Sequence, residues 1–168
     1  MPENPAQIPE NEQPMRVLRQ FRIVFNAVKS HFRQVEREAG VGGAQLWALS
    51  VIERNPGIGA TGLARELDIH QSTASNLVRG LVERGYVTGS REGADRRTVA
   101  LQVQPAGLAI LERAPMPFAG VLPDALASLD PATLAQLEDN LGRLIARLDV
   151  DEEAGQLPLS QQLQAQQA

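Results

Sequence analysis

Hydrophobic residues recur every three or four positions in the first part of the chain. The repeating positions are Leu18, Phe21, Phe25, Val28, Phe32 and Val35. This spacing predicts one apolar stripe along a helix from Met15 to about Ala39. Such a helix is roughly 35–40 Å long at 1.5 Å per residue, which is more than a small domain needs to cover its own core. We therefore expect the helix to pack against a partner as well.

Shorter apolar segments, separated by glycine and proline, occupy the middle of the chain. Their spacing predicts three helices, at residues 44–55, 60–67 and 72–84. Only a very short strand fits around Ile58. A short helix, a tight turn and a second short helix form the arrangement of a helix-turn-helix.

A β-hairpin is predicted directly after these helices. Residues 86–91 and 97–103 contain β-branched side chains, and the second segment alternates between apolar and polar positions. The polar residues 92–95 between them form the turn. Two short helices followed by such a hairpin are typical of a module that binds double-stranded DNA.

The last part of the chain contains two helical segments separated by prolines. Pro105 begins a helix that extends to Ala114, and Pro115 and Pro117 interrupt it because each lacks a backbone N–H. Asp130-Pro131 is a helix cap followed by a proline at the first helical position, which predicts another helix. Its apolar face consists of Leu134, Leu137, Leu141, Leu144, Ile145 and Leu148.

The two ends of the chain differ in composition from the rest. Residues 1–14 are proline-rich and polar, and residues 150–168 are acidic and then glutamine-rich, so we expect two disordered tails. The absence of cysteine excludes disulfides and thiolate metal sites. Because we find no apolar run of membrane-spanning length and no secretory pattern, we expect a cytoplasmic protein without a membrane partner.

The formal net charge of −4 has the wrong sign for a nucleic-acid binder. The acidic residues are concentrated at the ends, with three acids and no base in residues 1–14 and a surplus of five acids from Asp130 onwards. Residues 15–40 instead carry six bases against two acids, and residues 61–97 carry six arginines against five acids. The charge of the whole chain therefore says little about a DNA-binding face.

The predicted helix at 72–84 has an apolar face and an opposite polar face. The apolar face consists of Ala74, Leu77, Val78 and Leu81. The polar face carries Ser72, Thr73, Ser75, Asn76 and Arg79. These side chains can hydrogen-bond base edges and phosphates in a major groove. The alternative is an ordinary solvated helix face, but the short helix and tight turn before it favour DNA binding.

An acidic residue and two arginines, Asp95, Arg96 and Arg97, lie at the tip of the predicted hairpin. An extended arginine at a loop tip suits the narrow, electronegative minor groove, and Asp95 can hold the guanidinium of Arg97. The alternative is a surface salt bridge, which contributes little.

The chain at this point resembles the MarR family of bacterial winged helix-turn-helix transcription regulators. The residues that carry the resemblance are Leu63-Ala64, Ile69, Ser72-Thr73-Ala74-Ser75, Leu81 to Gly85-Tyr86-Val87, Asp95-Arg96-Arg97 and Gly107. The resemblance covers residues 15–149 and implies a mainly α fold with a small β-hairpin wing. It implies a winged helix at 44–103 and dimerisation helices at 15–39 and 105–149.

The resemblance also implies a homodimer that binds a near-palindromic DNA site, more commonly as a repressor than as an activator. The recognition helix is then 72–84 and the wing is 89–98, with the family's wing arginine at Arg97. Gly89 is a departure, because the family usually has an arginine there, and Arg91 is the nearest substitute.

MarR relatives often bind small aromatic acids or other phenolics in a crevice between the dimer scaffold and the winged helix, which weakens DNA binding. The candidate lining residues here are Phe25, His31, Phe32 and Trp47, with Arg65 as a carboxylate partner. Packing in the core or the dimer interface is the commoner role for a phenylalanine at helical spacing. For Trp47 the two alternatives are evenly balanced.

Other functions are disfavoured by what the sequence lacks. No nucleophile–base pair, phosphate-binding loop or paired acidic motif appears, so we expect neither an enzyme nor a cofactor. His31 and His70 lie in different elements without metal-binding spacing, so we expect no metal site. The remaining alternative is a winged-helix protein-interaction module without sequence-specific DNA binding, which the acidic net charge supports.

Overall fold

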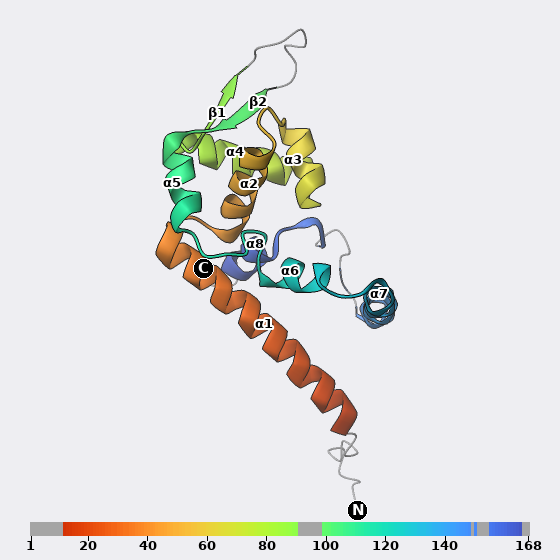
Figure 1. The fold of residues 1–168 in the computed structure, drawn as a ribbon. Coiled ribbons are helices and arrows are strands. Elements are labelled where there is room, and N and C mark those ends of the chain that lie inside the picture. The colour runs from red at the N-terminus through yellow and green to blue at the C-terminus, as the bar shows by residue number, and fades with distance from the viewer. Residues whose placement is uncertain (1–11, 91–98, 149, 151–154, 166–168) are drawn as a thin grey trace, which may run out of the picture.

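The computed structural model describes residues 12–90, 99–148, 150 and 155–165. Within these ranges the chain contains eight helices and one antiparallel two-stranded sheet (Figure 1). This architecture confirms the predicted mainly α fold with a small β-hairpin. The elements in chain order are α1 (Glu12–Ala39), α2 (Gly43–Arg54), α3 (Ala60–Leu67), α4 (Gln71–Glu83), β1 (Val87–Ser90), β2 (Ala100–Val103), α5 (Pro105–Arg113), α6 (Val121–Ala127), α7 (Pro131–Ile145) and α8 (Leu159–Ala165).

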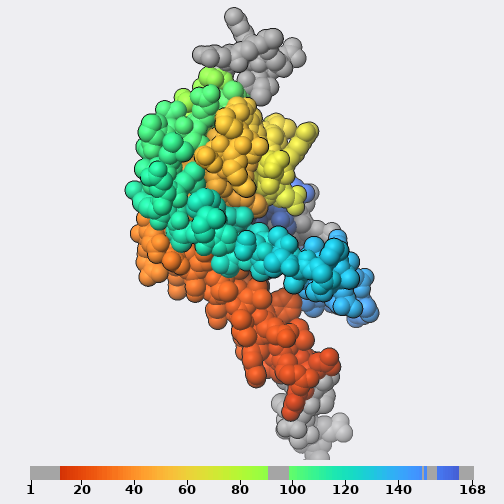
Figure 2. Space-filling view, viewed as in Figure 1, coloured from red at the N-terminus to blue at the C-terminus, as the bar shows by residue number. Residues whose placement is uncertain are grey.

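Helix α1 is the longest of these elements and extends well beyond the rest of the fold. It begins at Glu12, three residues before the expected start, because an acid in the first turn suits the positive end of a helix. Gly40, with a φ of 71°, ends it. The fully buried side chains of α1 begin only at Val28, and its first half projects from the body (Figure 2).

The core lies around helix α2. Leu46, Leu49 and Ile52 are each 0% exposed, as the apolar pattern of this segment predicts. Helices α3, α4 and α5 and strand β2 all contact α2, so the winged helix is built around it. The same α2 also contacts α1, and it therefore joins the winged helix to the long helix.

Strands β1 and β2 form the base of the wing. Val87 pairs with Val103 and Ser90 with Ala100. The short strand expected around Ile58 is reduced to two hydrogen bonds with β2: the Gly57 N–H donates to the Leu101 carbonyl at 2.8 Å, and the Leu101 N–H donates to the Ile58 carbonyl at 3.1 Å. These two hydrogen bonds connect the turn after α2 to the wing.

Two arginines from different elements meet the C-terminal end of α1. Arg84, just after α4, donates to the Gly40 carbonyl at 3.3 Å, and Arg113 at the end of α5 donates to the Ala39 carbonyl at 3.1 Å. Cations interact favourably with the last carbonyls of a helix. The winged helix is therefore fixed to α1 at this point on two sides.

The prolines after α5 break the helical path as predicted. Helix α5 ends at Arg113, and a non-helical segment containing Pro115 and Pro117 leads to α6. Asp130 caps α7, accepting hydrogen bonds from the Ala132 and Thr133 N–H groups at 3.1 and 3.0 Å. Helix α7 has no buried residue, so its apolar face is open to solvent in the single chain.

The C-terminal region differs from the expected tail. Residues 159–165 form helix α8, which contacts both α1 and α2, and Pro158 and Ser160 are buried. Within the apolar sequence Leu157-Pro158-Leu159, Pro158 is buried, whereas the two leucines are 39% and 37% exposed. Figure 1 shows α8 between α1 and the winged helix, beside α6.

Candidate nucleic-acid interface and effector pocket

A tight turn between α3 and α4 sets the direction of the recognition helix. Asp68 ends α3 in the left-handed conformation with a φ of 51°, which aspartate tolerates better than most residues. The Ile69 N–H donates to the Ala64 carbonyl at 3.0 Å, and the Ala74 N–H donates to the His70 carbonyl at 3.0 Å. The helix thus begins at Gln71, one residue before its predicted start.

The outward face of α4 carries most of the polar residues expected there. Ser72 and Arg79 are exposed and Ser75 is half-buried; the three recur at spacings of three and four residues and share one face. Thr73 is only 8% exposed, so its predicted place on the outward face is wrong. It lies one turn before Leu77, which is buried, and therefore turns toward the core with it.

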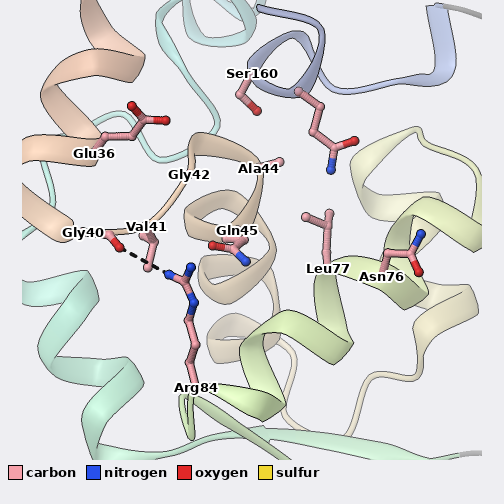
Figure 3. Close-up of a pocket in the computed structure, with 11 residues that line it drawn as sticks. Glu36, Gly40, Val41, Gly42, Ala44, Gln45, Asn76, Leu77, Arg84 and Ser160 are labelled. Atoms are coloured by element: carbon pink, nitrogen blue, oxygen red, sulfur yellow. Dashed lines mark hydrogen bonds between the residues drawn. The ribbon is translucent and has the colours of Figure 1, made fainter. Parts of the chain in front are cut away.

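Asn76 is exposed but lies to the side, at the edge of a polar cavity of about 480 Å³. This polar cavity is lined by Glu36, Gly40, Val41, Gly42, Ala44, Gln45, Asn76, Leu77, Arg84, Ser160 and Gln161. Figure 3 shows Asn76 and Leu77 of α4 on one side of it and Ser160 of α8 on another, with Arg84 bonded to Gly40 between α4 and α1. Asn76 thus borders two surfaces, the face of α4 and this cavity.

Helix α4 passes directly into the wing. The Gly85 N–H donates to the Val82 carbonyl and the Tyr86 N–H to the Leu81 carbonyl, both at 2.9 Å, and Gly85 has a φ of 71°. This hydrogen-bond pattern ends a helix with a left-handed glycine, as expected for Gly85. Asp95, Arg96 and Arg97, predicted to contact DNA from the wing tip, lie outside the described residues, as does Arg91.

Gly89 has a local packing role in the wing. A Cβ at Gly89 would lie 2.5 Å from Cγ1 of Val99, a distance at which one of the two must shift. A glycine at position 89 therefore leaves room for the side chain of Val99, which directly precedes β2. The arginine that the family usually carries at this position would have to displace Val99.

A second, largely apolar cavity of about 360 Å³ lies between α1, α2, α6 and the C-terminal segment. We call it the apolar cavity. Two of the predicted pocket residues, Phe32 and Trp47, line it, together with Val28 and Leu67. Asp68 and Ile69 of the turn before α4 line it too, so the cavity reaches the segment that sets the recognition helix.

The other predicted pocket residues do not line the apolar cavity. Phe25 is 57% exposed and stacks with Phe21, at a ring-centroid distance of 6.5 Å, on the projecting half of α1. His31 is buried behind Phe32, with ring centroids 5.9 Å apart. Arg65 is exposed on α3 and is not among the residues around the cavity. Phe25, His31 and Arg65 therefore do not line this cavity, and their part in an effector site stays a prediction.

Sequence reasoning missed two walls of this cavity. One comes from Ala119–Pro123 and Leu126, around the start of α6, and the other from Gly155 and Leu157–Ser160. Their residues are small or aliphatic and show no helical period that points to a cavity. The only signal was the short apolar sequence at 157–159 in an otherwise polar tail.

Helices α3 and α4 are joined by a tight turn and followed by a β-hairpin, and this arrangement defines a winged helix-turn-helix. The model of the MarR family matches residues 39–98, which contain α2, α3, α4 and β1. The winged helix of this chain is therefore similar to that of the MarR family. A protein of Thauera aromatica described as a putative transcriptional regulatory protein for the hcr operon is 29% identical over 118 residues. This alignment covers 70% of the chain but only 62% of the length of that relative.

Solved structures share the fold at lower sequence identity. A MepR-like protein complexed with pseudoligands has a TM-score of 0.54 at 17% identity, covering 79% of this chain and 90% of that one. The S. aureus MepR–DNA complex has a TM-score of 0.54 at 18% identity, covering 77% and 96%. BldR from Sulfolobus solfataricus has a TM-score of 0.52 at 18% identity, covering 84% and 100%.

No helix within the described part of the chain is both long and apolar enough to cross a membrane. In the same part of the chain, no group of three or more His, Asp or Glu side chains is placed to hold a metal ion.

Proposed function

We propose that this protein is a homodimeric transcription regulator, acting as a repressor, that binds a near-palindromic DNA site and is released from it by a small aromatic effector. The observation that carries the proposal is the outward face of α4. Ser72, Ser75 and Arg79 project from a helix that a helix-turn-helix presents to the major groove. The wing residues Asp95, Arg96 and Arg97 are proposed to enter the adjacent minor groove.

Two further findings support regulation of transcription. The matched relative from Thauera aromatica is described as a putative transcriptional regulator, and MepR, which shares the fold, was solved on DNA. A homodimer would supply two copies of α4 and place them on the two half-sites of the palindrome.

The test is DNA binding by the purified protein to duplexes from the regions flanking its own gene, measured by fluorescence anisotropy. Arg79→Ala should weaken binding by about 1–3 kcal/mol, roughly 5- to 150-fold, and Arg97→Ala should weaken it as well. Arg143→Ala is the matched control, because this arginine is exposed on α7 and its ion pair to Asp139 is only a 4.0 Å contact. Affinity should also fall steeply as the salt concentration rises.

The alternative function, a protein-interaction module, predicts a different result. No duplex would then be preferred, and Arg79→Ala would behave like Arg143→Ala. The net charge of −4 favours this alternative. The salt series separates the two because only phosphate contacts produce a steep dependence of affinity on salt.

The apolar cavity is the proposed effector site. Phe32 and Trp47 provide aromatic walls, and Gly43 and Ala44 belong to the first turn of α2. The amides of a first helical turn favour an anion, and the cap residue Gly42 offers no side chain to satisfy them. We therefore propose that the carboxylate of an aromatic acid is held by these amides and not by Arg65.

A series of ligands with one ring and different charges tests this assignment. Benzoate, benzamide and benzylamine can be titrated while the fluorescence of Trp47, the only tryptophan, is recorded. Benzoate should bind best, and it should weaken DNA binding in the anisotropy assay. Asp68 is the ionisable side chain among the cavity's described lining residues, and a preference for benzylamine would mean that Asp68 sets the ligand charge instead.

A further inference from the structure

The C-terminal segment 155–165 lies in the space between the long helix and the winged helix. Helix α8 contacts both α1 and α2. Ser160 is only 4% exposed, and Pro158 just before α8 is buried as well. The Gln162 side chain donates to the Leu157 carbonyl at 3.1 Å, which closes the segment on itself. The segment is therefore packed into the fold at a specific place.

Three elements converge at the N-terminal end of α2. A Cβ added at Gly43 would overlap the ring of Phe32 from α1 and would lie 3.3 Å from the Cβ of Ser160 from α8. The absence of a side chain at Gly43 thus lets Phe32 and Ser160 approach the same backbone from two sides. On its other side, the Phe32 ring faces Gly120 before α6. Phe32 of α1 and Ser160 of α8 therefore lie against the same backbone, and both line the apolar cavity.

Ser160 belongs to the walls of both the polar cavity and the apolar cavity. Figure 3 shows it on the side of α8 that borders the polar cavity. Leu157, Pro158 and Leu159 line the apolar cavity on the other side. Residues of the C-terminal segment thus line both cavities.

We propose that residues 155–165 form an intramolecular strap that closes the effector cavity and supplies one of its walls. Its role as an effector wall rests on the function proposed above, whereas its docking onto α1 and α2 does not. Leu157, Pro158 and Leu159 of the strap, which line the apolar cavity, make the apolar contacts with the ligand. An effector therefore binds tightly only when the strap is docked, and undocking exposes Trp47 to solvent.

The composition of the strap makes this proposal testable without altering the electrostatics of DNA binding. Residues 155–168 contain no Asp, Glu, Lys or Arg. A protein ending at Ala154 therefore keeps the formal net charge of −4. Any change in the cavity after this truncation reflects lost packing and not a changed charge, whereas binding to DNA depends mainly on charge.

The experiment compares the full chain with the chain ending at Ala154, using acrylamide quenching of Trp47 as the first readout. The truncated protein should show a red-shifted emission and a larger quenching constant. The second readout is titration with 2-naphthol, a neutral phenol whose binding does not depend on a carboxylate partner. Its affinity should fall by about ten-fold, which corresponds to about 1.4 kcal/mol of lost contacts.

Single substitutions control for misfolding of the truncated chain. Ser160→Tyr introduces a large side chain at a buried position and should reproduce both changes, whereas Gln156→Tyr, at an exposed position, should not. Circular dichroism and thermal unfolding establish that all variants are folded. Equal quenching of Trp47 in the full and truncated proteins would overturn the docking of the strap. Altered quenching with unchanged 2-naphthol affinity would overturn its role as a cavity wall.

The DNA-binding assay described above distinguishes a failure of this proposal from a failure of the proposed function. DNA binding by the ligand-free protein should survive the truncation. If neither protein binds any duplex, the regulator proposal fails, while the Trp47 and 2-naphthol measurements still decide whether the strap closes the cavity.

Discussion

Gly107 lies where the first turn of α5 crosses the end of the wing. A Cβ at this position would overlap the Tyr86 carbonyl oxygen and would lie 2.8 Å from Cγ1 of Val103. Because one of the obstructing atoms belongs to the backbone, the contact cannot be relieved by rotating a side chain. We expect Gly107→Ala to lower the free energy of unfolding by about 1–3 kcal/mol, as overpacking of a core does. Urea denaturation followed by circular dichroism measures the change.

Gly142→Ala is the matched control for this substitution. Gly142 lies inside α7 and has no atom within 4 Å of an added Cβ. Replacing a glycine in a helix by alanine should raise stability by about 0.5–1 kcal/mol. Equal destabilisation by the two substitutions would contradict the close approach at Gly107.

At the scale of residues, helical periodicity predicted buried positions better than it predicted contacts with a ligand. It placed Leu46, Leu49 and Ile52 in the core correctly. It could not separate Phe25 from Phe32, which lie on the same stripe of α1, because the difference depends on where the rest of the fold ends along that helix. Thr73 was misplaced because a polar residue at the edge of an apolar face can turn either way.

Asp130 links the stability of α7 to pH. The pKa of its carboxyl is lowered from the ordinary value of 3.8, first by the hydrogen bond from the Thr133 hydroxyl and then by the Thr133 N–H. A folded-state pKa below the unfolded value means that the stabilisation is complete above the unfolded pKa and is lost as pH falls through the folded pKa. Helix content from α7 should therefore decrease below about pH 4.

Circular dichroism at 222 nm between pH 3 and pH 6 measures this loss, and Asp130→Asn serves as the comparison. Asparagine can still accept the hydrogen bonds from Ala132 and Thr133 at a helix N-cap but does not titrate. The part of the transition that belongs to Asp130 should disappear in this variant. An unchanged transition would show that other carboxyls control the acid response.

At the scale of elements, the sequence predicted the helices of the winged helix within one or two residues. Helix α3 was predicted with its observed bounds, and Gly85, Pro115 and Asp130-Pro131 all mark the boundaries expected for them. Local signals were sufficient there, since caps and helix breakers act within a few residues. Helix α8 was missed because its stability comes from docking onto α1 and α2, and its own sequence is rich in glutamine.

At the scale of the whole molecule, the described residues leave an apolar surface uncovered on the projecting half of α1. Phe25 is 57% exposed there, beside a shallow groove that also involves Phe21, Leu144 and Leu148. Monomeric proteins rarely leave such a patch open, so we predict that a second chain covers it. Phe25→Glu should convert the protein from a dimer to a monomer in sedimentation equilibrium and should weaken DNA binding with it.

Ser30→Glu controls for the added charge. Ser30 is exposed on the opposite side of α1 from the apolar stripe, and its substitution should leave the dimer intact. A wild-type protein that sediments as a monomer would refute the predicted interface. The sequence indicated such an interface through the excess length of this helix, but the surface that α7 contributes became evident only from its lack of buried residues.

The two arginines at the C-terminal end of α1 attach that end of the helix to the rest of the fold, whereas its other end is free to move as α1 tilts. Arg84 and Arg113 hold the carbonyls of Gly40 and Ala39, while the opposite end of the 28-residue helix carries the surface predicted to meet the second chain. Helix α1 is about 42 Å long, so a tilt of about five degrees at its attached end displaces the far end by roughly 4 Å. Under the proposed function, an effector that moved Phe32 by about 1 Å near the fixed end of α1 would move the far end by roughly 4 Å, a distance comparable with the spacing of successive base pairs.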